Sequence, residues 1–526
     1  MEAKKFDIII AGAGPTGLML ACQLSRLGID FLILDKKAGP TKESRALVVQ
    51  ARSMEIYEQM GLSEKVESEG RPSAGISFYK KGRQLLTLSL ENMGKGLSPF
   101  PYVMIFEQSH NERLLYEDLQ SIGKQVSWNT EITDIREEEG RYSLVTRSTA
   151  EVSGSADPVG EVSCTYLIAC DGSKSKVRDF AGVDFTGGSY ENVFYVADTH
   201  IRGSALSRDK LSLFFTRASI TLLFPLPGDE RFRVLGILPK EYYHQEHIGF
   251  EDISGAVHEN LQLPVEFYET QWYSTYKLYH KKVDRFNKGN IFFVGDAAHV
   301  HSPAGGQGMN TGLQDAYNLA WKLALVLKNQ AARSLLDTYH EERNPVAERL
   351  LKTTDRLFSI MTGSNRISGF IKMHIVPRLL PLINKRKGFR TKWFSEVSQI
   401  KINYTRSSLS AGTAGQIKAG QRFPWFTVEH KGQQSSIFRL IRKQHVTPFL
   451  VLIYNLPDKE WTALDKQLFT VVSIDVNGFN DQALKGVGLP GAFVAVLRPD
   501  TYIGYLTEKG FEQAFLRLMK EGYSIN

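Results

Sequence analysis

The sequence predicts an α/β protein in which two separate stretches of chain share one parallel sheet, a mostly antiparallel sheet interrupts them, and a further α/β unit follows. Three observations lead to this prediction. A strand–helix–strand pattern with closely spaced glycines opens the chain at residues 6–35. Alternating apolar and polar residues take over from about 182 to 285, and buried strands with a closing helix return after 412.

The opening segment, FDIIIAGAGPTG, predicts a strand that turns directly into a helix. Its isoleucines, 8–10, have the continuous apolar character of a buried strand. Gly12, Gly14 and Gly17 follow at the spacing that permits a tight turn, close approach of backbone to a pyrophosphate, and close packing of helix on sheet. The helix continues to about Gly28.

A second strand, FLIL, ends in Asp35, where an acidic side chain grips ribose hydroxyls in dinucleotide-binding folds. Pro15 and Thr16 open the helix whose N-terminus would hold the pyrophosphate, and Lys36 would lie along the adenine or the phosphates. A structural glycine-rich turn and a solvated acid at a strand end are the alternatives. The complete order of strand, loop, helix, strand and acid favours a Rossmann-like dinucleotide-binding unit.

A second segment, NIFFVGDAAHVHSPAGGQGMNTG at 290–312, indicates which dinucleotide binds. IFFV predicts another buried strand, Gly295-Asp296 ends it, and a glycine-rich loop leads into a helix from about Met309. Free N–H groups at that helix start form a site for negative charge. A simple nicotinamide dehydrogenase needs no such second site, whereas a reduced flavin accumulates charge at its pyrimidine end.

Together these motifs resemble the FAD-dependent aromatic hydroxylases of the para-hydroxybenzoate hydroxylase type, which are single-component flavoprotein monooxygenases. GAGPTG matches their ADP-binding motif, Cys170-Asp171-Gly172 matches their central Asp-Gly motif, and GDAAHVHSPAGGQGMNTG matches their ribityl and isoalloxazine motif. Residues 44–61 also resemble the family's segment after the second strand. The resemblance covers roughly residues 5–425.

The resemblance implies a role for further residues around FAD. Arg45 would lie beside flavin and pyrophosphate, and a surface salt bridge is its alternative. Gln108 would contact the ribityl region, or else cap a helix. Asp171 would support the motif between FAD and the NADPH approach, with a plain turn-forming role as its alternative. The remaining implied contacts are adenine for Ile132, the ribityl chain for Asp296, flavin and substrate for Pro303, and the isoalloxazine pyrimidine end for Gly306, Gly308, Met309 and Asn310.

The resemblance also implies the reaction. NADPH reduces FAD, O2 forms a flavin C4a-hydroperoxide, and its distal oxygen passes to an electron-rich ring. The substrate would be an aromatic compound, phenolic or polyketide-like, under the antiparallel sheet. Predicted lining residues are Phe214, Leu222, Phe224 and Trp272. The sequence does not single out a catalytic base, for which the candidates are Tyr190, Tyr195 and Tyr273.

Two other functions remain open at this point. The chain could be a flavin monooxygenase that inactivates an antibiotic such as a tetracycline. It could also be a non-catalytic flavin-binding protein that acts through its C-terminal part, although the intact motifs argue against that hypothesis.

The expected domain order places the FAD-binding domain in two parts, 1–181 and 286–345, around a β-sheet substrate domain at 182–285. A helical segment, 346–411, precedes the last unit, 412–526. That unit resembles the thioredoxin-like C-terminal domain of larger hydroxylases in this family. It has no CxxC pair, so we expect a structural or dimer-contact role, and a homodimer is one expected assembly.

Composition suits a soluble globular protein of two or three domains. The 526 residues are 42% hydrophobic, and 64 Lys and Arg against 57 Asp and Glu give a net charge of +7. No basic helix or aromatic RNA motif accompanies that charge, so nucleic acid is not an expected partner. The basic run at 385–392 is better explained as a solvated loop than as a membrane-surface patch. A basic surface would favour the approach of anionic substrates and NADPH.

Neither a metal site nor a disulfide framework is predicted. The three cysteines, Cys22, Cys164 and Cys170, are sparse and odd in number. His299 and His301 are two residues apart and lack a third ligand in the sequence pattern, so the flavin motif explains them better than zinc does. No apolar leader is visible before the first strand, and no run approaches the roughly 20 apolar residues of a spanning helix. The cytoplasm is therefore the expected location.

Overall fold

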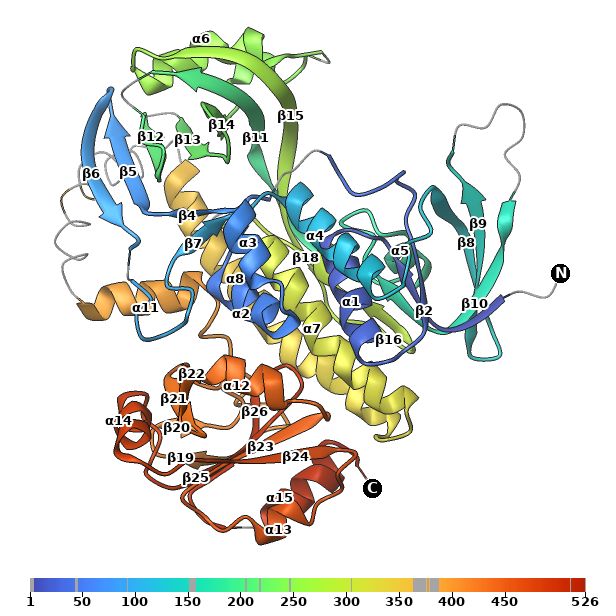
Figure 1. Ribbon diagram of the computed structural model, residues 1–526. Helices are drawn as coiled ribbons and strands as arrows, with labels where there is room; N and C mark the ends of the chain where they lie inside the picture. The colour runs from blue at the N-terminus through green and yellow to red at the C-terminus, as the bar shows by residue number, and fades with distance from the viewer. Residues whose placement is uncertain are drawn as a thin grey trace.

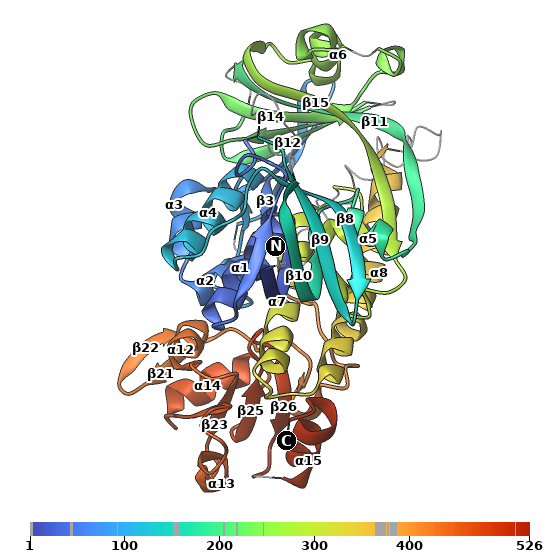
Figure 2. The same ribbon diagram turned by 90° about the vertical axis from the view of Figure 1, so that its right-hand side faces the viewer.

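The computed structural model describes residues 4–42, 46–91, 93–150, 158–203, 206–216, 219–245, 247–303, 305–362, 375, 378, 387–510 and 512–525. In Figure 1 and Figure 2 the large antiparallel sheet lies at one end of the molecule, the parallel sheet with its helices lies in the middle, and the C-terminal unit lies at the other end. This arrangement of mixed helices and sheets confirms the predicted α/β class.

The middle sheet has seven strands within the described residues and joins distant parts of the chain. β1 pairs in parallel with β2 on one side and with β10 on the other, and β10 pairs in parallel with β17. The second half of β1 and most of β2 are buried, whereas β8 and β9 alternate between buried and exposed residues. Its strands are β1 (Lys4–Ala11), β2 (Phe31–Leu34), β8 (Thr130–Glu138), β9 (Arg141–Ser148), β10 (Pro158–Ala169), β16 (Asn287–Lys288) and β17 (Ile291–Phe293).

Two helices that bring the glycine motifs together pack side by side on this sheet. α1 (Pro15–Arg26) follows β1, and α7 (Gly308–Leu327) follows β17 and the glycine-rich loop. The turn before α1 requires glycine at Gly12, whose φ is +99° and whose added Cβ would lie 2.4 Å from the carbonyl oxygen of Cys170. The two motifs therefore meet at the carboxyl ends of neighbouring strands.

The antiparallel sheet has eight strands in the described ranges. Its long strands, β11 and β15, pair along most of their length. β5 and β6 join this sheet through a parallel pairing with β12, although they fall within the range 1–181 that we assigned to the FAD-binding domain. α6 (Phe250–Leu261) covers the outer face. The strands are β5 (Gly75–Lys80), β6 (Arg83–Ser89), β11 (Phe185–Arg202), β12 (Lys210–Phe215), β13 (Ile220–Pro225), β14 (Arg231–Ile237), β15 (Glu266–Val283) and β18 (His299–Val300).

Shorter elements fill the space around the two sheets. α2 (Ala51–Met60) begins after Gln50, and Gly61 ends it in the left-handed conformation. The polar stretch 151–161, whose composition is typical of a hairpin tip, lies largely outside the described residues. The remaining elements are β3 (Val48–Val49), α3 (Ser63–Glu69), β4 (Arg71–Ser73), β7 (Val103–Ile105), α4 (Gln108–Ser121), α5 (Lys176–Phe180), η1 (Lys240–Tyr242), η2 (Gly295–Ala297), η3 (Arg333–Asp337), α8 (Thr338–Thr362) and α11 (Lys387–Val397).

The C-terminal unit has a sheet of its own, in the order β20-β19-β26-β25-β23-β24. β23 and β24 are parallel, whereas β25 and β26 form an antiparallel hairpin around Pro499-Asp500. Its elements are β19 (Ala411–Ala414), β20 (Ile417–Lys418), β21 (Thr427–His430), β22 (Gln433–Ser436), α12 (Ile437–Gln444), β23 (Phe449–Tyr454), α13 (Lys459–Thr462), β24 (Phe469–Ile474), α14 (Gly478–Gly486), β25 (Phe493–Leu497), β26 (Ile503–Thr507), α15 (Gln513–Arg517) and the π-turn η5 (Leu518–Gly522).

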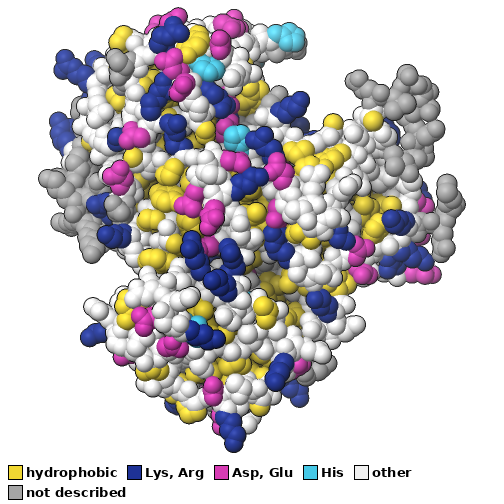
Figure 3. Space-filling view, viewed as in Figure 1, with side chains coloured by type: hydrophobic (Ala, Val, Ile, Leu, Met, Phe, Trp, Pro, Cys, Tyr) yellow, Lys and Arg dark blue, Asp and Glu magenta, His cyan; other side chains and the backbone are white. Residues whose placement is uncertain are grey.

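The surface carries mixed charge. In the view of Figure 3, Lys and Arg side chains are scattered among Asp and Glu side chains rather than gathered into one stripe. Among the described helices, none has the length and apolar character needed to cross a membrane.

Candidate active site

The turn between β1 and α1 leaves room for a ligand at one glycine and none at its neighbours. Gly14 caps α1, and a Cβ added to it would meet no described atom within 4 Å. A Cβ added to Gly17 would lie 2.0 Å from the carbonyl oxygen of Gly12. Pro15 takes the first helical position, where a missing N–H costs nothing. The open N-terminus of α1 thus has the geometry of a pyrophosphate site.

Asp35 braces this turn from the end of β2. Its side chain is buried, and its two oxygens accept hydrogen bonds from the N–H groups of Ala13 at 2.7 Å and Lys37 at 2.8 Å. Each carboxylate oxygen has a second lone pair, so ribose hydroxyls could still be bound there. Lys36 is exposed beside it. The sequence pattern did not reveal that Asp35 also holds the glycine turn.

The residues predicted to contact the adenine and ribityl parts lie around the same sheet edge. Gln108 begins α4, where its Oε1 accepts from the N–H of Ala46 at 3.3 Å. Ile132 is buried in β8. Asp296 is exposed in η2, directly after β17. Arg45 lies outside the described residues, so its predicted place beside the flavin stays a prediction.

The loop before α7 is fastened by Asn310. Its Oδ1 accepts from the N–H of Gln50, and its Nδ2 donates to the carbonyls of Val48 and Gly306, all at 2.8 Å. The side chain therefore joins β3 to the glycine loop, which adds a structural role to the predicted backbone contact. Gly306 has φ +61°, and a Cβ there would lie 2.8 Å from Cβ of Val48. Gly308 and Met309 form the first turn of α7, and Pro303 is exposed in the loop.

Three polar atoms in these loops are buried without a hydrogen-bond partner among the described residues: Oδ1 of Asp171, Nε2 of His301 and Oγ of Ser302. Burial raises the pKa of the Asp171 carboxyl, while burial and His299 lower the pKa of His301 to about 4. Buried polar groups rarely stay unpaired in native proteins. Their presence beside the open α1 and α7 N-termini fits a polar cofactor.

A charged cavity of about 360 Å³ lies between the start of α4 and the antiparallel sheet. Behind its wall Arg233 is buried and donates to both oxygens of Asp198, at 2.6 and 2.7 Å. The register of the sheet places Asp198 opposite both Arg233 and Trp272. The alternation of Arg231 and Arg233 with apolar residues in β14 was the sequence signal that could have indicated a charged site on this sheet. The lining residues are Lys42, Glu107, Ser109, His110, Asp198, Arg231, Gln271 and Trp272.

The predicted substrate-lining residues divide between the two faces of the antiparallel sheet. Leu222 and Phe224 pack against the core that the sheet shares with the FAD-binding part, and Trp272 lines the charged cavity. Phe214 lies on the opposite face, stacked on Tyr79 at 4.6 Å in the cluster under α6. We therefore withdraw Phe214 from the predicted lining, because strand alternation turns it away from the site.

The three candidate bases divide in the same way. Tyr195 and Tyr273 belong to the α6 side of the sheet, away from the glycine loop. Tyr190 lies on the inner side, where its hydroxyl donates to Asp355 and its ring meets His280 edge to face. Burial raises the pKa of Tyr190 above its usual value of 10. Of the three, only the placement of Tyr190 suits contact with a substrate.

The histidine pair of the glycine loop has structural partners. Nε2 of His299 lies 2.8 Å from Oδ2 of Asp315, and its ring stacks on Phe286. His301 contacts the carbonyl of Ser302 through Nδ1. Within the described part of the chain, no three His, Cys, Asp or Glu side chains are grouped as metal ligands. The same part contains all three cysteines, each buried and unpaired.

Comparisons with known proteins agree with this geometry. Residues 5–354 match the family model described as FAD binding domain. The chain is 31% identical over 527 residues to 6-methylpretetramide 4-monooxygenase of Streptomyces rimosus, covering 97% of this chain and 91% of that protein. It is 31% identical over 365 residues to pentachlorophenol 4-monooxygenase of Sphingobium chlorophenolicum, covering 68% of this chain and 65% of that protein.

Solved structures show the same fold over the full length. The anhydrotetracycline hydroxylase OxyS of Streptomyces rimosus has a TM-score of 0.78 at 25% identity, covering 99% of each chain. Aklavinone-11 hydroxylase, solved with FAD and aklavinone, has a TM-score of 0.79 at 18% identity and covers 100% of each chain. The chain belongs to the FAD-binding domain family and is an FAD-dependent monooxygenase of the aromatic hydroxylase type.

Proposed function

We propose that this enzyme hydroxylates a phenolic or polyketide-like aromatic substrate with NADPH and O2. The observation that carries the proposal is the convergence of two helix N-termini and the Asp296 turn at one edge of the parallel sheet, beneath an apolar face of the antiparallel sheet. A dinucleotide with an aromatic ring system fits such a site, and an apolar roof suits an aromatic substrate.

Bound FAD supplies the electron transfer and oxygen chemistry, and the chain supplies binding, orientation and exclusion of water. The N-terminus of α1 binds the pyrophosphate, and Asp35 orients the ribose. Asp296 holds the ribityl chain. The first turn of α7, from Gly308 to Asn310, presents N–H groups and the positive end of a 20-residue helix to negative charge on the ring. Leu222 and Phe224 keep water from the reacting side.

NADPH is proposed as the reductant because a charged cavity is lined by Glu107 and Ser109, the two neighbours of the predicted ribityl contact Gln108. Lys42 and Arg231 are two of the cations that line it, and Trp272 offers an aromatic wall. The net charge of +7 also favours encounters with an anionic cosubstrate. A homodimer and a cytoplasmic location stay predictions, as do the domain boundaries, with β5 and β6 moved to the substrate domain.

Polycyclic substrates are favoured within the aromatic class. One relative that this chain matches over almost its whole length is named for 6-methylpretetramide, and another relative, from Streptomyces venezuelae, is named rifampicin monooxygenase. The second name supports the alternative that this enzyme inactivates an antibiotic. Both functions use the same flavin site and differ in what enters it.

The test is a screen of aromatic compounds against the purified, FAD-loaded enzyme. We expect one FAD per chain, and a substrate should accelerate NADPH consumption and give a product 16 Da heavier by mass spectrometry. Tetracyclines and rifamycins in the panel separate antibiotic inactivation from turnover of a simpler phenol or a polyketide precursor. A protein that takes up no FAD after reconstitution would refute the proposal. A protein that binds FAD but never oxidises NADPH would be the non-catalytic flavoprotein.

A further inference from the structure

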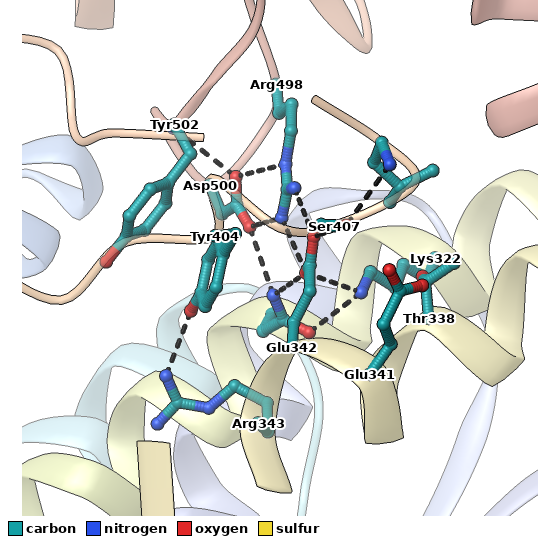
Figure 4. Close-up of polar contacts among 12 residues, drawn as sticks. Lys322, Thr338, Glu341, Glu342, Arg343, Tyr404, Ser407, Arg498, Asp500 and Tyr502 are labelled. Atoms are coloured by element: carbon teal, nitrogen blue, oxygen red, sulfur yellow. Dashed lines mark hydrogen bonds and ion pairs between the residues drawn. The ribbon is translucent and has the colours of Figure 1, made fainter. Parts of the chain in front are cut away.

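Buried charges concentrate where the hairpin between β25 and β26 meets helices α7 and α8. Arg498 donates to both oxygens of Glu342, at 2.5 and 2.9 Å, and to Asp500 at 2.6 Å. Lys322 donates to Glu342 at 2.8 Å. All four side chains are at most 1% exposed. Figure 4 shows them gathered between the C-terminal unit and the two helices.

Arg343, the residue after Glu342 in α8, extends this network toward α7. Arg343 is fully buried and donates to the hydroxyl of Tyr404 at 2.9 Å, as Figure 4 shows. Its other nitrogens donate to Oδ1 of Asp315 at 2.6 Å and to the carbonyl of Thr311 at 3.2 Å. The ring of Tyr404 packs on that of Tyr502, with centroids 4.4 Å apart. Arg343 thus joins the C-terminal hairpin to the first turn of α7.

Asp315 completes the path to the cofactor loop. Its Oδ2 accepts from the N–H of Gly295 at 3.2 Å and lies 2.8 Å from Nε2 of His299. These two residues stand on either side of Asp296, the predicted ribityl ligand. The carboxylate of Asp315 therefore fixes the turn that aims Asp296, and Arg343 fixes Asp315.

A second part of the network extends to α2, which begins next to the glycine loop. Arg52 of α2 is 1% exposed and donates to the carbonyl of Asp500 at 2.8 Å and to the hydroxyl of Thr501 at 3.0 Å. Two residues earlier, the N–H of Gln50 binds Asn310 in the glycine loop. The hairpin thus contacts both chain segments that hold the loop.

Such a network tolerates few arrangements. Buried charges are stable when each is paired with good geometry, and loss of one partner leaves another charge unpaired in a low dielectric. The hairpin, Arg343 and the Gly295–His299 turn are therefore held in one mutual arrangement.

We propose that the C-terminal unit, together with Tyr404 just before it, is part of the cofactor site. Tyr404 and Asp500 are positioning residues for the Asp296 turn: Tyr404 acts through Arg343 and Asp315, and Asp500 acts through Arg498 and Glu342, the residue before Arg343. This inference rests on the proposed function for the identity of the cofactor, and it goes beyond the structural or dimer-contact role expected from the sequence.

The experiment compares Tyr404→Phe with Tyr502→Phe in the full chain. Tyr404→Phe removes the hydroxyl that Arg343 binds and keeps the ring stack. Tyr502→Phe is the matched control, because the hydroxyl of Tyr502 is buried in the same stack without a hydrogen-bond partner among the described residues. Asp500→Asn is a second variant that removes the charge from the hairpin itself.

Two readouts are measured: amide hydrogen exchange of residues 294–312 in the FAD-free protein, and the Kd for FAD by flavin fluorescence. We expect Tyr404→Phe and Asp500→Asn to speed exchange in 294–312 and to raise the Kd for FAD about three- to tenfold, within the range that one hydrogen bond gives. Tyr502→Phe should match the parent in both.

A purely structural role would lower the melting temperature of Tyr404→Phe while leaving exchange in 294–312 and the Kd for FAD unchanged, and that result would overturn the proposal. If Tyr404→Phe does not fold, the same two readouts on Asp500→Asn decide. If the parent itself fails to bind FAD, the proposed function is wrong, yet the exchange measurement on the FAD-free chains still decides whether the hairpin positions the turn.

Discussion

Replacement of either Gly14 or Gly17 by alanine should weaken FAD binding, but for opposite physical reasons. In Gly17→Ala the new Cβ would lie 2.0 Å from the carbonyl oxygen of Gly12 and 3.2 Å from Cβ of Cys170. The helix or the turn must move by about 1 Å to restore ordinary contact, and overpacking of that kind costs about 1–3 kcal/mol. The FAD-free protein should therefore lose stability.

Gly14→Ala should leave the FAD-free protein almost unchanged. Gly14 has φ −75°, which alanine adopts freely, and its Cβ would meet no described atom within 4 Å. Any change in unfolding free energy should stay within about 1 kcal/mol, the scale of a poorer N-cap. The same Cβ occupies the space through which a pyrophosphate approaches the backbone, so the Kd for FAD should rise at least about tenfold, or about 1.4 kcal/mol.

Urea denaturation of the FAD-free proteins and flavin fluorescence titration measure the two quantities separately. The expected pattern is a loss of both stability and affinity in Gly17→Ala, and a loss of affinity alone in Gly14→Ala. If Gly14→Ala bound FAD as tightly as the parent, the pyrophosphate would not lie over this turn and the assignment of the α1 N-terminus would fail.

Three further predictions concern single side chains. Asp296→Ala should weaken FAD binding at least about tenfold, since charge-assisted hydrogen bonds contribute about 1.5–3 kcal/mol, and an unchanged Kd would contradict its ribityl role. Asp198→Ala should lower the unfolding free energy by about 3 kcal/mol, the lower end of the range for breaking a buried pair, because Arg233 would stay buried with only its 3.5 Å contact to Glu107. Asp134→Ala, at the exposed pair with Arg136, should cost less than about 1 kcal/mol in the same urea titration. Burial shifts the pKa of His301 from 6.5 to about 4, so the unfolded chain binds more protons than the folded chain between these pH values. The stability of the FAD-free protein should therefore fall as the pH drops from 6.5 to 4. His301→Gln should flatten that dependence in melting curves recorded at several pH values.

Local patterns explain why much of the cofactor site could be predicted from sequence. Gly12, Gly14 and Gly17 lie within six residues of one another, and their conformational demands are met on the spot by the turn they form. Asp35 and Asp296 each end a buried strand of the same parallel sheet, so their convergence follows from sheet geometry. These features need no knowledge of distant contacts.

The face of the sheet that a side chain occupies, and whether that side chain is buried, were harder to predict. Both depend on which strands pair with its own strand and on what packs against the sheet. Phe214 was expected in the pocket, yet Phe214 and Phe215 are equally apolar neighbours, and register alone decides which one faces α6. The charged cavity was missed because Asp198 and Arg233 become partners only when β11 and β14 pair, across 35 residues of sequence.

The network of buried charges between the C-terminal hairpin and helices α7 and α8 was the hardest feature to predict from sequence. Pro499-Asp500 has the composition of an exposed hairpin turn, and nothing near it in sequence indicates that Asp500 is 1% exposed. Its partner Arg52 lies 448 residues away, and Glu342 lies 156 residues from Arg498. Apolar side chains also hold the C-terminal unit, since Trp321 and Leu325 of α7 belong to one buried cluster with Phe449 of β23. Apolar contact is non-directional and accepts small shifts in position. Charges with fixed hydrogen-bond geometry do not accept such shifts, which is why we assign the network to positioning of the cofactor loop rather than to adhesion alone.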